Sequence, residues 1–271
     1  MELWSGLDSL GHTALLMAAA LLAGALNAVA GGGSFLTLPA LVFTGVPPVV
    51  ANATGTVALL PGYIASAWAL KDVMAPPPGL RMGQTMALSL LGGAAGAALL
   101  LGTPNTTFAR VVPWLLLAAT ALFALGPQIR AWSMRQATTT VEAAAGHAPP
   151  STAPSTFKAA LGMLAVALYG GYFNGGLGIL CLALFGLLGQ TQLHAMNGMK
   201  NLVSALLTAI AVALYAAGGI VAWPQALVMM LAATVGGFAG AKLAQHIPAT
   251  VLRWAIVATG LVMAGLFFAK G

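Results

Sequence analysis

Apolar residues run in long blocks along this chain, and polar residues mark the gaps between them. Five blocks span roughly residues 10–30, 34–45, 52–71, 82–103 and 108–126, and five more span roughly 158–174, 177–189, 196–218, 223–245 and 249–268. A helix needs about 20 apolar residues to cross a hydrocarbon core of about 30 Å. The pattern therefore predicts an all-α, polytopic membrane protein with two sets of about five helical segments.

The second block of each set is too short to span a membrane upright. About a dozen residues make a helix of only about 18–20 Å, and Pro39 interrupts the first copy. The first two blocks of each set form either a broken, re-entrant hairpin or two short tilted spans. Both alternatives return the chain to the side where it began, so we expect about eight to ten spans.

Four landmarks recur in the same order in both sets, which indicates an internal duplication. They are an asparagine in the first block, an asparagine in the third, a glycine-rich motif in the fourth and a proline after it. Small residues at such spacing are typical of close helix–helix contacts in membranes. The matching pairs are Asn27 and Asn174, Asn52 and Asn197, Gly92–Ala97 and Gly236–Ala241, and Pro104 and Pro248.

The composition agrees with a membrane protein. Hydrophobic residues make up 60% of the chain and charged residues only 5%, whereas a soluble domain carries about 25% charged residues. The segment between the two sets is instead rich in Thr, Ala, Pro and Ser. We predict a first membrane repeat over residues 1–127, a polar linker over 128–157 and a second repeat over 158–271.

The basic residues predict the orientation. Tracing the blocks through the membrane places most lysines and arginines on the side of the linker, and the positive-inside rule makes that side cytoplasmic. Each set then crosses an odd number of times, so the halves are predicted to be inverted repeats. The basic residues on the linker side are Lys71, Arg81, Arg130, Arg135, Lys158, Lys200, Lys242 and Arg253.

Two interruptions in the apolar blocks combine an asparagine with clustered glycines. Three consecutive glycines lower helix preference by about 3 kcal/mol relative to alanine, and a helix broken inside the membrane exposes N–H groups that suit an anion. Paired breaks in two halves point to the binding site of a transporter. The candidate substrate-binding residues are Asn27, Gly31, Gly32, Gly33, Ser34, Asn52, Thr54, Asn174, Gly175, Gly176, Asn197, Lys200 and Asn201.

Lys200 has two interpretations. It either extends to the cytoplasmic interface or provides the counter-charge for an anionic substrate, at a cost of about 3 kcal/mol near the bilayer centre. The four acidic residues lie outside the apolar blocks, so no carboxylate is expected for a proton relay or a sodium site. No metal or cofactor motif, phosphate-binding loop, nucleophile–base pair or clustered basic patch for nucleic acid is present, so we expect no cofactor and no enzyme activity.

Two segments resemble the repeats of the sulfite exporter TauE/SafE family. The first runs from Gly24 to Ala53 and includes GGG at 31–33 and PP at 47–48, and the second runs from Tyr169 to Asn201 and includes YFNGGLG and MNGMKN. The resemblance implies a bacterial inner-membrane permease for small sulfur-containing or carboxylate anions such as sulfite and organosulfonates. Residues 53–56 and 174–176 depart from the family's commoner patterns, which leaves the substrate open.

We therefore predict an exporter or uniporter of a small anion that works by alternating access in the lipid bilayer. The interior-negative potential drives anions outward by about 2.3 kcal/mol per charge per 100 mV, which favours export. The alternatives are a channel-like anion facilitator and a membrane scaffold that transports nothing. The sequence leaves open whether two copies form a homodimer.

Overall fold

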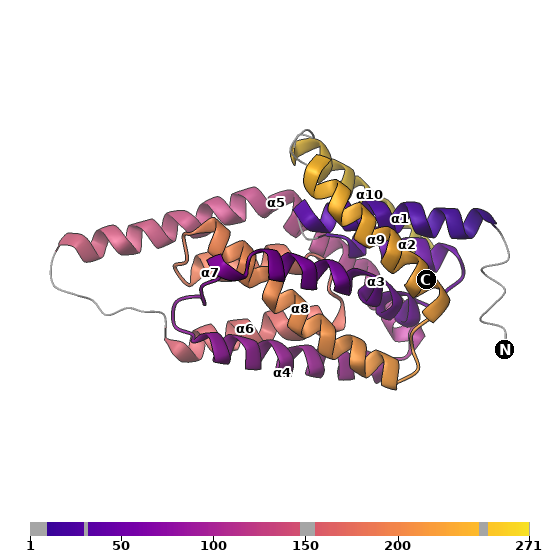
Figure 1. Ribbon diagram of the computed structural model, residues 1–271, viewed down its shortest axis with the longest axis horizontal. Coiled ribbons are helices and arrows are strands. Elements are labelled where there is room, and N and C mark those ends of the chain that lie inside the picture. Colours follow the sequence, from indigo (N-terminus) through magenta and orange to yellow (C-terminus); the bar gives the residue numbers. More distant parts are fainter. Residues whose placement is uncertain (1–9, 30–31, 147–154, 244–248, 271) are drawn as a thin grey trace.

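The computed structural model describes residues 10–29, 32–146, 155–243 and 249–270, and every regular element within them is helical. The all-α prediction is confirmed for these ranges, and each of the ten expected segments corresponds to one α-helix (Figure 1). The elements are α1 (Leu10–Val29), α2 (Ser34–Phe43), α3 (Pro48–Ala69), the short 3₁₀ helix η2 (Lys71–Val73), α4 (Met82–Leu101), α5 (Asn105–Gly146), α6 (Thr156–Tyr172), α7 (Leu177–Leu187), α8 (Leu193–Ala217), α9 (Trp223–Leu243) and α10 (Ala249–Lys270).

Three helices of the described chain are long and apolar enough to cross a membrane by themselves. They cover Pro48–Ala69, Met82–Leu101 and His194–Ala217. Shorter apolar helices include Ser34–Phe43 and Leu177–Leu187, the two segments that the sequence marked as too short. The structure therefore supports a membrane-embedded helical protein, and the number of spans stays a prediction.

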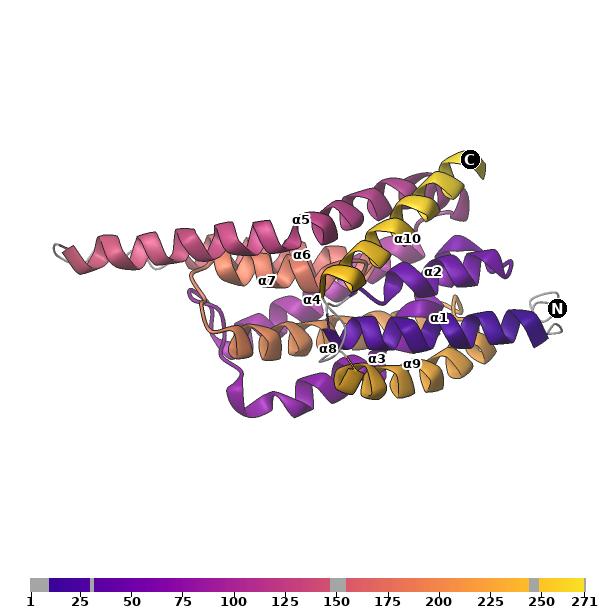
Figure 2. The same cartoon turned by 90° about the horizontal axis from the view of Figure 1, so that it is seen from above.

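Helix α5 continues into the range that the sequence assigned to a linker. It runs from Asn105 to Gly146 and extends past the other helices (Figures 1 and 2). Residues 128–145 contain neither glycine nor proline, and several are good helix formers such as Ala, Arg, Met and Gln, so nothing local ends the helix earlier. The rest of the predicted linker, 147–154, lies outside the described residues.

The two halves of the chain pack through exchanged helices. Helix α1 packs along α9, and α4 packs along α6, and both pairs run side by side in Figures 1 and 2. Glycines permit this close approach, because an added β-carbon would overlap a backbone carbonyl oxygen of the facing helix at Gly24, Gly96, Gly171 and Gly236. The glycine motifs of the fourth segments thus form helix–helix contacts.

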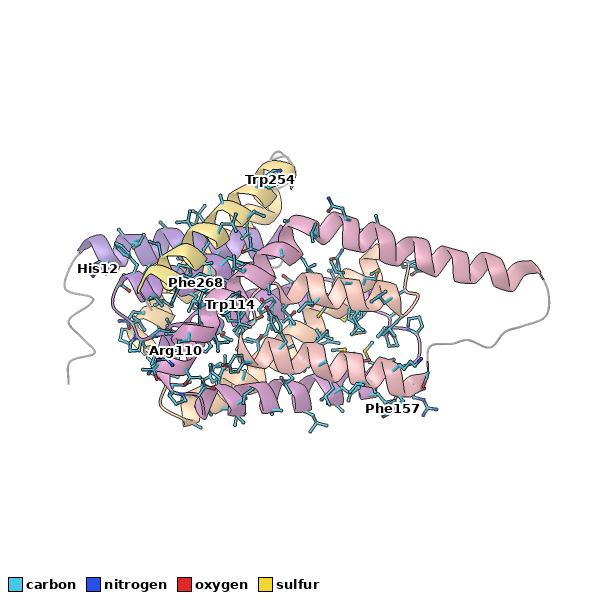
Figure 3. The ribbon with its side chains drawn as sticks, turned by 180° about the vertical axis from the view of Figure 1, so that it is seen from behind. His12, Arg110, Trp114, Phe157, Trp254 and Phe268 are labelled. Carbon is cyan, nitrogen blue, oxygen red and sulfur yellow. The ribbon has the colours of Figure 1, made fainter. Side chains whose placement is uncertain are left out.

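Helices α3 and α8 pack against each other and bury much of their length inside the molecule. Helices α5 and α10 form a further pair, where Trp114 and Phe268 meet edge to face with ring centroids 5.2 Å apart (Figure 3).

Hydrogen bonds also join the loops between helices. At one end of the molecule, Gln190 Nε2 donates to the carbonyl of Ala75 at 2.9 Å. At the other end, the N–H of Ala222 donates to Thr54 Oγ1 at 3.0 Å.

The short helices α2 and α7 end in the same way. Gly45 and Gly189 follow them with φ angles of 89° and 91°, in the left-handed region that glycine occupies without strain. The N–H of Val46 then bonds to the carbonyl of Leu41 at 3.0 Å, and that of Gln190 to the carbonyl of Phe185 at 2.9 Å. The two short helices, which the sequence assigned to matching places in the two sets, therefore end with the same backbone geometry.

We predict that Gly96→Ala destabilises the protein by about 1–3 kcal/mol, because its β-carbon would overlap the carbonyl of Leu168 and force α4 and α6 apart. Gly83→Ala in the first turn of the same helix is the matched control, since no atom lies within 4 Å of its added β-carbon. Thermal unfolding of the purified protein in detergent measures both. Equal stability of the two variants would contradict the packing described here.

Candidate functional site

The break between α6 and α7 is formed by four buried residues, Phe173 to Gly176. Asn174 has a φ of 62° and Gly176 has a φ of 72°, and asparagine and glycine are the residues that adopt this left-handed conformation most readily. Asn174 is only 1% exposed. The local sequence thus unwinds the backbone in the interior, as the glycine cluster predicted.

Three side chains from three helices donate to carbonyl groups of this break and of the last turn of α6. Asn52 Nδ2 on α3 donates to the carbonyl of Tyr172 at 3.0 Å. The hydroxyl of Tyr169 on α6 donates to the carbonyl of Gly175, and the hydroxyl of Tyr215 on α8 donates to that of Gly171. These bonds satisfy carbonyl oxygens that would otherwise be costly in an apolar interior.

The donors of the same break are left free. Within the described chain, no acceptor is bonded to the N–H groups of Asn174, Gly175 and Gly176, and the buried Asn174 Nδ2 also lacks a partner. The N-terminus of α7, which begins at Leu177, points its positive dipole end into the same place. Successive free amides in left-handed and turn conformations are typical of anion-binding concavities.

The break between α1 and α2 is described only in part, because the predicted site residue Gly31 lies outside the described residues. The carbonyl of Gly32 accepts from the N–H of Phe35 at 3.2 Å. A β-carbon at Gly33 would lie 2.8 Å from the carbonyl oxygen of Ala23, so this glycine permits close packing. Ser34 is buried at the start of α2.

Tyr63 on α3 joins the two breaks. Its hydroxyl donates to Asn174 Oδ1 at 3.4 Å, and the side chain of Asn27 lies near the same hydroxyl. Asn27 Oδ1 is itself buried without a partner. The structure thus brings Asn27 and Asn174, from corresponding places in the two halves, to one tyrosine.

Lys200 lies inside the protein, on α8. It is 5% exposed, and no hydrogen bond or ion pair joins it to any residue in the described ranges. It is close enough to Cys181 on α7 for an electrostatic interaction, and Cys181 is likewise close to Tyr63.

The remaining predicted residues lie toward the two ends. Asn197 is half-buried and Asn201 is buried on α8, where Gly198 packs under Leu70 and Met74. Both Asn197 and His194 are helical, because α8 begins at Leu193. Thr54 is already engaged by the α8–α9 loop.

Sequence reasoning missed the tyrosines. The chain has four, and three of them donate hydroxyl groups to the α6–α7 break, while the carbonyl of the fourth, Tyr172, accepts from Asn52. A buried tyrosine hydroxyl needs a partner, so hydroxyls inside apolar blocks were a signal of unwound backbone nearby.

Comparison with known proteins gives a consistent answer. The sequence profile of the family described as "Sulfite exporter TauE/SafE" matches residues 16–267. The chain belongs to this family. The resemblance inferred from the motifs is therefore confirmed. The two breaks and the cross-packed helices are those of a member of a membrane transporter family.

Two relatives carry similar names. The chain is 33% identical over 118 residues to the "Probable membrane transporter protein ORF9" of a Sinorhizobium species, covering 43% of this chain and 44% of the relative. It is 30% identical over 125 residues to a "Probable membrane transporter protein" of Haemophilus influenzae, covering 46% and 47%. The matches span less than half the length of these relatives. No solved structure matches the chain.

We predict that Asn174→Gly keeps the stability of the protein better than Asn174→Ala. Both variants lose the side chain that accepts from Tyr63. The left-handed backbone lowers the free energy of unfolding by about 1–2 kcal/mol for alanine but not for glycine. Thermal unfolding in detergent separates them. If both variants unfold at the same temperature, the left-handed backbone at residue 174 is not a constraint on this site.

Proposed function

We propose that this TauE/SafE protein is a carrier for a small oxyanion that binds at the α6–α7 break. The observation that carries the proposal is the imbalance of hydrogen-bonding groups at the break. Asn52, Tyr169 and Tyr215 donate to the carbonyls of Tyr172, Gly175 and Gly171 at the break and in the last turn of α6, whereas the N–H groups of residues 174–176 and Asn174 Nδ2 have no acceptor in the described chain. A ligand that only accepts hydrogen bonds completes such a site.

The anionic group we propose is a sulfite or sulfonate. Such a group presents three oxygens and can therefore accept from several amides at once, and Lys200 is a buried cation on α8. The family description supports a sulfur oxyanion. Asn174 would bind through its free Nδ2, with Tyr63 holding its Oδ1 in place.

We further propose that the halves are inverted repeats and that the carrier works by alternating access. The first helix of each half packs against the fourth helix of the other half, α1 with α9 and α6 with α4. A two-fold relation between the halves requires this arrangement. Helix α2 leads to the end where Thr54 meets Ala222, and α7 leads to the end where Gln190 meets Ala75. The break is buried between these two contacts, which supports a carrier over an open channel.

The proposed location is the bacterial inner membrane, with the α5–α6 connection in the cytoplasm and export as the direction of transport. The concentration of basic residues on that side supports the orientation. The membrane potential then assists an anion that leaves the cell.

We predict that sulfite, thiosulfate or methanesulfonate raises the unfolding temperature of the purified protein, and that the neutral isostere methanesulfonamide does not. A ligand at 100 times its Kd stabilises the folded state by about 2.7 kcal/mol. Asn52→Ala should weaken binding about 10-fold, because it frees the carbonyl of Tyr172 to repel the anion. Differential scanning fluorimetry gives the Kd.

Asn105→Ala is the matched control, because this amide accepts from the N–H of Val49 at 3.1 Å, away from the break. Its affinity for the anion should equal that of the wild type. If none of the anions stabilises the protein, the proposed site is wrong. If Asn52→Ala binds as tightly as Asn105→Ala, the occupied carbonyls do not shape the site.

We predict that Thr106 and Thr156 lie on opposite sides of the membrane. Both are exposed near the first residue of a helix, α5 and α6 respectively, so each is replaced by cysteine in a Cys181→Ala background. An impermeant maleimide should label Thr106→Cys in intact cells and Thr156→Cys only after the membrane is disrupted. The reverse pattern would overturn the orientation, and equal labelling would overturn the number of crossings between them.

A further inference from the structure

Helices α4 and α6 run parallel, so they begin at the same end of the molecule. An added β-carbon at Gly92 would lie 2.5 Å from the β-carbon of Ala167. One turn later along α4, an added β-carbon at Gly96 would lie 2.7 Å from the backbone nitrogen of Tyr172, which is further along α6. Both helices therefore advance in the same direction, and their first turns lie next to each other (Figure 1).

Two exposed cations stand where this pair begins. Arg81 directly precedes α4, and Lys158 lies in the first turn of α6. At about 1.5 Å per residue, Arg81 is about 16 Å from the level of Gly92 and Lys158 about 14 Å from that of Ala167, so the two cations lie at nearly the same height. The residue before Arg81 and the residue after Lys158 are both buried in one hydrophobic cluster, which places the two cations on neighbouring parts of the surface.

Neither cation has a counter-ion in the described chain. No ion pair joins Arg81 or Lys158 to another described residue, and neither α4 nor α6 contains an acidic residue. The exposed Asp72 belongs to η2, which packs against α8. Gln84 adds a donor, because its Oε1 accepts from the N–H of Arg81 at 2.9 Å and leaves its Nε2 for another partner. Charged donors of this kind suit a phosphate group.

An exposed apolar seam leads from these cations along the helix pair. It consists of Leu91 on α4 and of Leu161 and Leu168 on α6, and all three side chains are exposed. At about 100° per residue, these leucines lie on the same side of the Gly92 contact in both helices. Phe157, which is 75% exposed, lies at the cation end of this seam, where α6 begins (Figure 3).

We propose that this seam binds an anionic phospholipid of the phosphatidylglycerol type. Its phosphate would accept from Arg81 and Lys158, and an acyl chain would lie along Leu91 and Leu161. A zwitterionic lipid fits less well, because its own ammonium group would face two cations without an acid on either helix. The lipid would join one helix from each half of the chain, at the opposite end of α6 from the proposed transport site.

The charges set the expected size of the effect. A basic side chain near an anionic lipid surface changes the affinity by about 5-fold. Arg81→Gln and Lys158→Gln should therefore each weaken lipid binding about 5-fold, and the double variant about 25-fold. Arg81→Lys and Lys158→Arg keep the charges and should retain most of the affinity.

The test titrates dioleoyl phosphatidylglycerol into the purified full-length protein in a neutral detergent. A ligand of the folded state raises the unfolding temperature in proportion to its occupancy, so the shift should be large for this lipid and small for dioleoyl phosphatidylcholine. Lys71→Gln is the matched control. Lys71 is an exposed cation on η2 that lies over the ring of Trp68 at 4.6 Å, away from the seam, and its variant should bind the lipid as the wild type does.

Each alternative has its own outcome. Equal stabilisation by phosphatidylcholine, or equal losses in Lys71→Gln and Arg81→Gln, would mean diffuse attraction and would overturn the proposed lipid site. Equal stabilisation by glycerol 3-phosphate would mean that a soluble phosphate suffices, which also overturns it. Methanesulfonate should stabilise the double variant as much as the wild type, because the transport site lies elsewhere. Loss of the lipid effect therefore leaves the proposed function standing, and the reverse also holds.

Discussion

The unwound backbone between α6 and α7 is the constraint on which the rest of this structure depends. In a membrane, each peptide group of such a segment needs a partner from the protein itself. Asn52, Tyr169 and Tyr215 supply donors for its Gly175 carbonyl and for two carbonyls in the last turn of α6, and they come from α3, α6 and α8. The positions of these helices are therefore tied to the break, and the unpaired amides are what remains for a ligand.

This division of hydrogen bonds also explains why a neutral amide is useful at position 174. Asparagine tolerates the left-handed backbone, and its Oδ1 accepts from Tyr63, which turns Nδ2 away as a free donor. A carboxylate at the same place would repel an anion. The same side chain thus satisfies the backbone requirement and contributes to the proposed binding site.

The sequence predicted the helices well because their signals are local and strong. Long apolar blocks, Asn174 with its glycines, and the GGxxG motifs around Gly92 and Gly236 each act on their own segment or on one partner helix. The end of α5 at Gly146 was missed because a polar composition was taken to mean an irregular linker, although no residue there breaks a helix. The roles of Tyr63 and Tyr215 could not be predicted, since they depend on contacts between residues 111 and 44 positions apart.

The glycine contacts set a condition on any movement of the molecule. Where α4 meets α6 and α1 meets α9, backbone touches backbone at Gly96, Gly171, Gly24 and Gly236, and such surfaces cannot slide without overlap of atoms. Each pair is therefore expected to move as one body. Because each pair takes one helix from either half, a shift that opens one end of the molecule must displace helices of both halves. Such a joint displacement of both halves is what the proposed alternating access needs, because one side must close as the other opens.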